Sequence, residues 1–195
     1  MVINNALNQA SLKSDDICYI ECHGTGTALG DPIEVHALRN IFQHRNEPLY
    51  LGSVKTNIGH LETAAGIAGL IKLILCLQKR KVPPNINFKN INPEINLNNA
   101  PIKIVTELIK LPSNKNIYGG VSSFGFSGTL AHIIVEGVDQ KTRPVFEYPF
   151  QNREFCAPFE IPDYYFNYKL LIQKTPNFKI ESLDFISKIQ NIIRS

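Results

Sequence analysis

The stretch His23-Gly24-Thr25-Gly26-Thr27 decides the interpretation of this chain, together with a second stretch, Lys55-Thr56-Asn57-Ile58-Gly59-His60. Each places a histidine in tightly turned, glycine-containing backbone directly after a short apolar run. Short apolar runs that end in turn residues are typical of buried strands. Two histidines at strand ends can converge on one site. There the N–H of one imidazole can stabilise a developing oxyanion, while the second imidazole transfers a proton or binds a carboxylate. The alternative is that both histidines have only turn or capping roles.

The segments around these two loops predict an α/β fold. We expect helices at residues 2–9, 31–42 and 62–78, an extended loop at 85–100, and strands at 17–21, 50–54, 102–105, 118–122 and 131–136. In the second helix, Asp31 is expected to cap, Pro32 to occupy the first turn and Glu34 to complete a capping box. Strand–loop–helix units followed by late strands imply a sheet with functional sites at the strand ends.

Composition excludes several classes of function. The 195 residues are 44% hydrophobic and carry a net charge of +3, with scattered lysines and arginines, so we expect no nucleic-acid partner. The four cysteines lack CxxC spacing and the five histidines lack helical i, i+4 pairing, so we expect no metal site. No apolar stretch is long enough to span a membrane. Reduced thiols and the absence of a membrane segment favour a cytoplasmic protein.

Three long segments resemble the ketosynthase (β-ketoacyl synthase) domain of polyketide synthases. Ile20 to Glu34, IECHGTGTALGDPIE, resembles the first histidine motif of that family, and Gly52 to Glu62, GSVKTNIGHLE, resembles the second. Val121 to His132, VSSFGFSGTLAH, resembles its closing glycine-rich motif, although Leu130 stands where the family has asparagine. The motifs follow the order of the family over roughly residues 5–136.

The resemblance implies the thiolase-like fold, with five αβαβα layers, and decarboxylative Claisen condensation as in polyketide or fatty acid biosynthesis. It implies no covalently bound cofactor, because the substrates are pantetheine-linked acyl thioesters on an acyl carrier protein. By resemblance, the catalytic residues are His23 and His60, the supporting residues Lys55, Glu62 and Phe126, and the pantetheine-binding residues Thr25 and Thr27. Phe126 would gate the pocket and its backbone N–H would line the oxyanion hole. From the sequence alone, a Lys55–Glu62 pair could be buried and fix the loop, or lie on the surface.

The family's nucleophilic cysteine lies well upstream of the first histidine motif, and the residues before His23 contain no matching segment. None of Cys18, Cys22, Cys76 and Cys156 has the expected surroundings for an activated thiolate.

We therefore expect the C-terminal half of a ketosynthase, a truncated acyltransferase-family enzyme that does not catalyse condensation by itself. The alternatives are a half-enzyme complemented in trans by the missing N-terminal half, and a non-catalytic interaction or homodimerisation remnant. A nucleotide-binding module, suggested by the glycine loop alone, is a weaker alternative.

The sequence predicts a boundary near residue 137. Residues 1–137 form the ketosynthase portion, and residues 138–195 form a linker-like tail rich in Phe, Tyr and Pro. The tail ends in an amphipathic helical stripe from Leu183 to Ile193.

Overall fold

The computed structural model describes residues 1–137. Its helices are α1 (Val2–Gln9), α2 (Gly30–Phe42), α3 (Lys55–Ile58) and α4 (Ala65–Lys79), with 3-10 turns at Ser14–Asp16 and Glu62–Ala64. Its strands are β1 (Ile17–Glu21), β2 (Leu49–Gly52), β3 (Lys81–Val82), β4 (Ile102–Ile104), β5 (Ile109–Lys110), β6 (Ile117–Phe124) and β7 (Leu130–Gly137). The predicted linker-like tail and its amphipathic helix lie outside the described residues.

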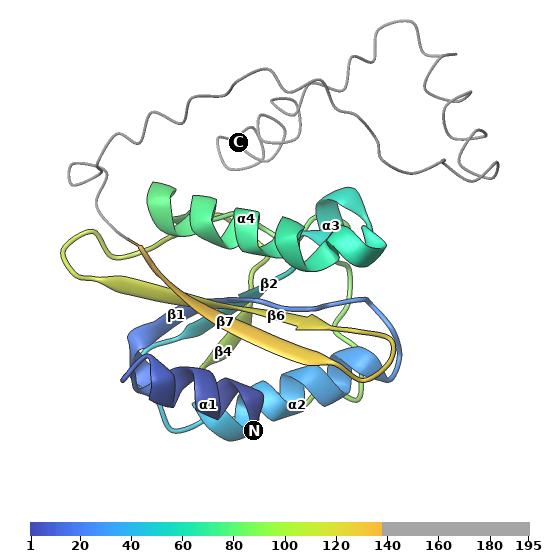
Figure 1. Ribbon diagram of the computed structural model, residues 1–195, viewed down its shortest axis with the longest axis horizontal. Coiled ribbons are helices and arrows are strands. Elements are labelled where there is room, and N and C mark those ends of the chain that lie inside the picture. The colour runs from blue at the N-terminus through green and yellow to red at the C-terminus, as the bar shows by residue number, and fades with distance from the viewer. Residues whose placement is uncertain (138–195) are drawn as a thin grey trace, which may run out of the picture. The chain divides into compact units, whose positions relative to one another are not determined.

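A five-stranded sheet in the order β4-β2-β1-β6-β7 forms the centre of this unit. Its first four strands run parallel, and β7 pairs antiparallel with β6 as a hairpin. Figure 1 shows α4 on one face of the sheet and α1 and α2 on the other. The carboxyl ends of β1, β2 and β6 therefore lie at one edge, which is where parallel α/β sheets carry their sites.

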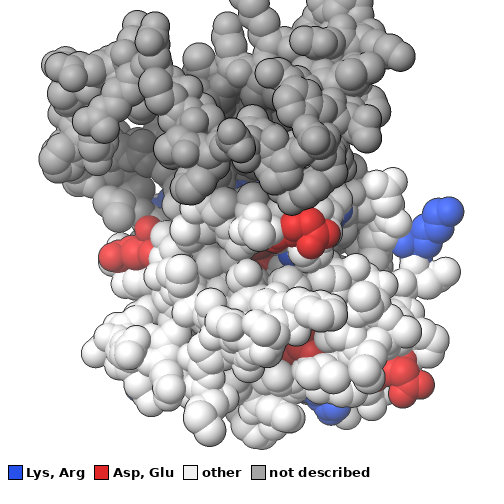
Figure 2. All heavy atoms as spheres, turned by 45° about the vertical axis from the view of Figure 1, so that its right-hand side comes forward, with Lys and Arg blue, Asp and Glu red and all other residues white. Residues whose placement is uncertain are grey.

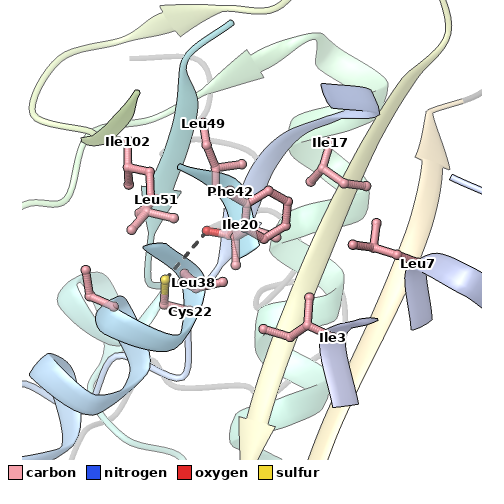
Figure 3. Packing of buried hydrophobic residues seen from close by; sticks show 11 residues of the cluster. Ile3, Leu7, Ile17, Ile20, Cys22, Leu38, Phe42, Leu49, Leu51 and Ile102 are labelled. Atoms are coloured by element: carbon pink, nitrogen blue, oxygen red, sulfur yellow. Dashed lines mark hydrogen bonds between the residues drawn. The ribbon is translucent and has the colours of Figure 1, made fainter. Parts of the chain in front are cut away.

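The main hydrophobic core lies between the sheet and the α1/α2 layer. Ile3 and Leu7 from α1, and Leu38 and Phe42 from α2, belong to the same buried cluster as Ile20 of β1, and their side chains point toward the strands in Figure 3. This core fixes β1, the strand that leads into the first histidine loop.

On the opposite face of the sheet, α4 approaches closely because Gly119 of strand β6 has no side chain. A Cβ placed on Gly119 of β6 would lie 2.5 Å from Leu73 Cδ1 of α4. The first parts of β1 and β6 are covered on both faces, which agrees with the apolar residues and glycines at 17–20 and 117–121.

Most predicted elements are present, but four details of the prediction were wrong. Helix α2 begins at Gly30 without a side-chain cap, since Asp31 Oδ1 accepts the Gly26 N–H and the Glu34 carboxylate accepts two other N–H groups of the same loop. Strand β2 ends at Gly52, and the expected loop after it contains the short helix α3. The third helix starts at Ala65, after a 3-10 turn. The two-residue strands β3 and β5, which pair with each other, were not predicted.

Within residues 1–137, none of the helices combines the length and apolarity needed to cross a bilayer. The same residues contain no group of three or more His, Cys, Asp or Glu side chains placed to hold a metal ion.

Candidate active site

The two histidine loops meet at the carboxyl edge of the sheet. His23 follows β1, and His60 follows α3 through Gly59, whose φ of +75° favours glycine. The two imidazole rings lie 5.8 Å apart between centroids and are nearly perpendicular, at 85°. The ring of His23 also lies 5.1 Å from that of Phe124, the last residue of β6. Three strand ends that are distant in the sequence thus contribute to one site.

Each imidazole accepts a backbone hydrogen bond at Nδ1. The Phe124 N–H donates to His23 Nδ1 over 3.3 Å, and the Glu62 N–H donates to His60 Nδ1 over 2.9 Å. A neutral imidazole whose Nδ1 accepts carries its proton on Nε2, because only one ring nitrogen is protonated. Both rings therefore present an Nε2–H donor, which is the tautomer needed to hold a developing oxyanion.

The electrostatic surroundings keep His23 neutral. Burial, the positive charge of Lys55 and the neighbouring His60 together lower the pKa of His23 from 6.5 to about 4. At neutral pH the ring is thus an N–H donor without a full positive charge.

Lys55 and Glu62 do not pair, so the buried form of the Lys55–Glu62 pair is excluded. Lys55 Nζ turns inward and donates to the His23 carbonyl oxygen. Glu62 stands at the start of a 3-10 turn with a φ of +48°, and its side chain is 88% exposed. Its Oε1 atom lies 3.7 Å from His60 Nδ1. Lys55 therefore joins the two histidine loops, whereas Glu62 contacts His60 mainly through its backbone N–H.

The predicted pantetheine contacts lie on the exposed side of the first loop. Thr27 Oγ1 accepts the Gly30 N–H over 3.0 Å and lies 3.3 Å from Thr25 Oγ1. One acceptor site of the Thr27 hydroxyl is thus used inside the loop. The side chain of Phe126 is fully exposed in the turn between β6 and β7.

Buried groups that the sequence did not indicate hold the first loop in place. Glu34 of α2 is 6% exposed, and its carboxylate accepts the N–H of His23 over 2.7 Å and that of Gly24 over 2.9 Å. Burial raises the pKa of Glu34 from 4.5 to about 6, although these two N–H donors oppose the rise. On the other side of the loop, Ser53 Oγ donates to the Gly24 carbonyl oxygen over 3.3 Å. Glu34 closes the first histidine motif, eleven residues after His23, but the sequence indicated only a capping role for it.

Asn85 was also missed, since the sequence indicated only a loop there. Its side chain is buried, with Oδ1 accepting the Ser53 N–H over 2.8 Å. Its Nδ2 donates to the carbonyl oxygens of Leu51 and Val105 over 3.2 and 3.0 Å. Asn85 therefore fastens the end of β2, just before the second histidine loop.

The cysteines of residues 1–137 are poor nucleophiles. Burial raises the pKa of Cys18 to about 11 and that of Cys76 to about 12, and it raises the pKa of Cys22 well above 9.0. Cys22 lines a cavity of about 860 Å³ beside α2. Neither His23 nor His60 lines this cavity. Since a thiolate is required for acyl transfer, none of these three thiols is poised to attack. Cys156 lies outside the described residues.

Two models of known protein families match this chain. A family model described as "Beta-ketoacyl synthase, C-terminal domain" matches residues 1–89, and one described as "Ketoacyl-synthetase C-terminal extension" matches residues 92–153. The chain belongs to the β-ketoacyl synthase family. The second match overlaps the first part of the segment that we interpreted as a linker-like tail.

Relatives of this β-ketoacyl synthase segment include polyketide synthases. It is 46% identical over 140 residues to a highly reducing polyketide synthase of Aspergillus terreus, covering 70% of this chain and 5% of that protein. It is 49% identical over 136 residues to probable polyketide synthase 17 of Dictyostelium discoideum, covering 68% of this chain and 5% of the relative. The chain thus spans about 5% of the length of these relatives.

Solved ketosynthase structures share the fold. Ketosynthase twelve of the bacillaene polyketide synthase from Bacillus amyloliquefaciens matches with a TM-score of 0.67 at 42% identity, over 71% of this chain and 25% of that one. A module 6 bacillaene ketosynthase from Bacillus subtilis matches with a TM-score of 0.64 at 39% identity, over 68% and 25% of the two chains. The predicted thiolase-like fold is confirmed, and the described sheet with helices on both faces is an αβα portion of it.

Proposed function

We propose that this chain supplies the two-histidine half of a condensing centre. The reaction is the decarboxylative condensation of an acyl thioester with a malonyl-type thioester carried on the pantetheine arm of an acyl carrier protein in the cytoplasm. The observation that carries the proposal is the pair of Nε2–H donors on rings 5.8 Å apart, each fixed by a backbone N–H at Nδ1.

In the proposed reaction the histidines hold the oxygen of the extender thioester. Decarboxylation breaks the bond to the carboxylate, releases CO₂ and leaves the electron pair as an enolate, whose oxygen the Nε2–H groups of His23 and His60 stabilise. The enolate carbon then attacks the acyl carbonyl, forming the new C–C bond and expelling a cysteine thiolate. Neutral imidazoles suit this role, and the lowered pKa of His23 keeps that ring neutral at physiological pH.

The remaining residues have supporting roles in the proposal. Lys55 holds the His23 carbonyl and adds positive charge near the enolate. Glu62 positions His60 through its N–H. Thr25 and Thr27 face the side from which the pantetheine arm enters, and Phe126 gates the pocket with its backbone N–H directed to the second oxyanion.

The acyl-carrying cysteine must come from a further segment. The raised pKa values of Cys18, Cys22 and Cys76 support this part of the proposal. We expect these 195 residues by themselves to bind neither acyl group nor extender productively. A ketosynthase segment bearing the nucleophile, in the same polypeptide or on a partner, completes the centre.

Intact-mass spectrometry tests the proposal. The chain is combined with a cysteine-bearing N-terminal ketosynthase segment, an acyl thioester and malonyl-loaded carrier protein. We expect acylation of the added segment, followed by extension of the acyl group by two carbons. His23→Ala and His60→Ala should abolish extension, whereas the exposed-site variant His44→Ala should not. Condensation by the chain alone, or no condensation by the combination, would refute the proposal.

A non-catalytic association module is the second candidate, and one observation favours it. Phe126, Leu130 and Ile133 of the β6–β7 hairpin are exposed large apolar side chains, which is the kind of side chain that interaction surfaces use. If the chain forms a stable homodimer or complex that is unaffected by His23→Ala and His60→Ala, and no condensation is recovered, this function replaces the first.

A further inference from the structure

A single buried carboxylate connects the segments that carry the two histidines. Glu21 ends β1, two residues before His23, and is 1% exposed. Its Oε1 accepts the N–H of Val54, the residue that precedes α3 and the second histidine loop. Its Oε2 accepts the Tyr19 hydroxyl over 2.5 Å and lies 2.9 Å from Lys72 Nζ of α4, the helix that follows His60.

The surrounding backbone leaves room for this carboxylate. A Cβ on Gly69 of α4 would lie 3.2 Å from Glu21 Cγ, so a side chain at residue 69 would crowd the carboxylate side chain. A Cβ on Gly52 of β2 would lie 2.5 Å from Tyr19 Oη. Strand β1, the end of β2 and helix α4 therefore converge on Glu21, with a glycine on each neighbouring element.

Stability alone is a poor explanation for this arrangement. The Lys72 and Glu21 side chains are 3% and 1% exposed, and taking both charges out of water costs several kcal/mol per ion. Although the Lys72 ammonium lies 2.9 Å from Glu21, it makes no well-aligned hydrogen bond within residues 1–137. Apolar side chains of similar volume often stabilise a core as well as a buried ion pair does, or better.

The hydrogen bonds of Glu21 instead provide orientation. Burial, and next the negative charge of Glu21, raise the pKa of Tyr19 well above 10.0, so its hydroxyl stays a donor to the carboxylate. One Glu21 oxygen is thereby fixed by Tyr19 and Lys72, and the other is left to hold the Val54 N–H. The second histidine loop is anchored to the strand that carries the first.

We propose that Glu21 is a positioning residue for the condensing site, with Lys72 as its counter-ion. It sets the distance and angle between the His23 and His60 rings by holding the Val54 backbone against β1. Its relevance to catalysis rests on the proposed function, but its effect on the geometry of the histidines does not.

Two matched double variants test this inference. Glu21→Gln/Lys72→Met keeps an acceptor oxygen for the Val54 N–H, while Glu21→Met/Lys72→Met removes it, and both replace the buried ion pair with neutral groups of similar size. In the 195-residue chain, imidazole NMR gives the His23 pKa and the contact between the His23 and His60 rings. With Gln we expect a His23 pKa close to that of the wild type. With Met we expect it to rise by about one unit toward 6.5, with loss of the ring–ring contact.

Leu77→Ala is the matched control for stability. Leu77 is buried on α4 and packs near Gly119 and Gly137, away from Glu21. It should weaken the fold without changing the His23 pKa. If the Met variant does not fold, Tyr19→Phe removes only the hydroxyl donor and should move the His23 pKa in the same direction by less. Unchanged histidine signals in the folded Met variant, or in Tyr19→Phe if that is the variant examined, overturn the inference.

A condensation assay separates this inference from the proposed function. In the complemented enzyme, the Met variant should lose about 100-fold in kcat, as expected for a small misplacement of catalytic groups, while the Gln variant recovers most of it. If the wild-type combination shows no condensation, the proposed function fails, and the histidine NMR signals still decide whether Glu21 positions the rings.

Discussion

Replacement of Glu34 by alanine should both destabilise the fold and loosen the first histidine loop. In the wild type, the Glu34 carboxylate accepts the His23 and Gly24 N–H groups over 2.7 and 2.9 Å. Alanine leaves both donors without this partner. The loop that carries His23 should then open more often, although no atom of the imidazole has been changed.

The expected size of the effect follows from the two N–H groups that alanine leaves without an acceptor. Each such group costs about 1–3 kcal/mol where water cannot reach it. Because His23 and Gly24 are half-buried, the expected loss for Glu34→Ala is about 1–4 kcal/mol. Glu34→Gln keeps an acceptor and removes the charge, so its stability should stay within about 1 kcal/mol of the wild type.

Urea unfolding and amide hydrogen exchange measure the two effects. An m-value of about 2 kcal/mol/M turns the loss into a midpoint lowered by roughly 0.5–2 M. The His23 and Gly24 amides should exchange faster in Glu34→Ala, while the exposed-site control Glu94→Ala should match the wild type. An unchanged midpoint together with unchanged exchange at both amides would refute the role assigned to Glu34.

Glu34 also makes the stability of the fold depend on pH, and the sign of this dependence follows from its raised pKa. Because the folded protein holds the Glu34 proton more tightly than the unfolded chain, its contribution is most favourable below pH 4.5 and is lost as the pH rises through about 6. Glu34→Gln should remove this component from the pH profile of stability. If Glu34 instead makes the fold more stable as the pH rises, the two N–H donors lower its pKa by more than burial raises it.

Three further predictions concern single contacts. Asn85→Ala leaves the buried Ser53 N–H without its side-chain acceptor and should cost about 1–3 kcal/mol in urea unfolding, whereas Asn90→Ala, at an exposed site, should cost under about 0.5 kcal/mol. Gly52→Ala would place a Cβ 2.5 Å from the Tyr19 hydroxyl, and a loss of about 1–3 kcal/mol is expected from overpacking, with no loss counting against the tight fit. NMR titration should give a His23 pKa of about 4, and a value near 6.5 would show that its surroundings are open to water.

The sequence predicted the parts of the fold that depend on local patterns. The apolar run before His23 indicated β1, and the small-residue helix after His60 indicated α4, because strand and helix periodicity are properties of neighbouring residues. Strands β3 and β5 have two residues each, which is too short for any periodic signal. They form because the chain after α4 returns beside residues 109–110.

The site was predictable only where a motif marked it. Both histidines were identified from their loops, but the sequence left their shared Nε2–H tautomer undetermined, since that depends on backbone donors from Phe124 and Glu62. Glu34 fits a capping box by spacing alone. Its use as an acceptor for the first loop depends on α2 lying under that loop, which is a tertiary relation. In the same way, nothing local distinguishes Asn85 from its neighbouring asparagines.

Glu21 and Glu34 resolve one physical problem from two sides. A glycine-rich turn leaves backbone N–H groups without helix or strand partners, and at a buried or half-buried strand end water reaches them poorly. Here the N–H groups of His23, Gly24 and Val54 are held by the two carboxylates, and Lys55 holds the His23 carbonyl. The polar interior below the loops therefore fixes the backbone through groups other than the imidazole Nε2 atoms. It follows that the acids around His23, rather than the glycines beside it, determine how rigidly the two histidine loops are held.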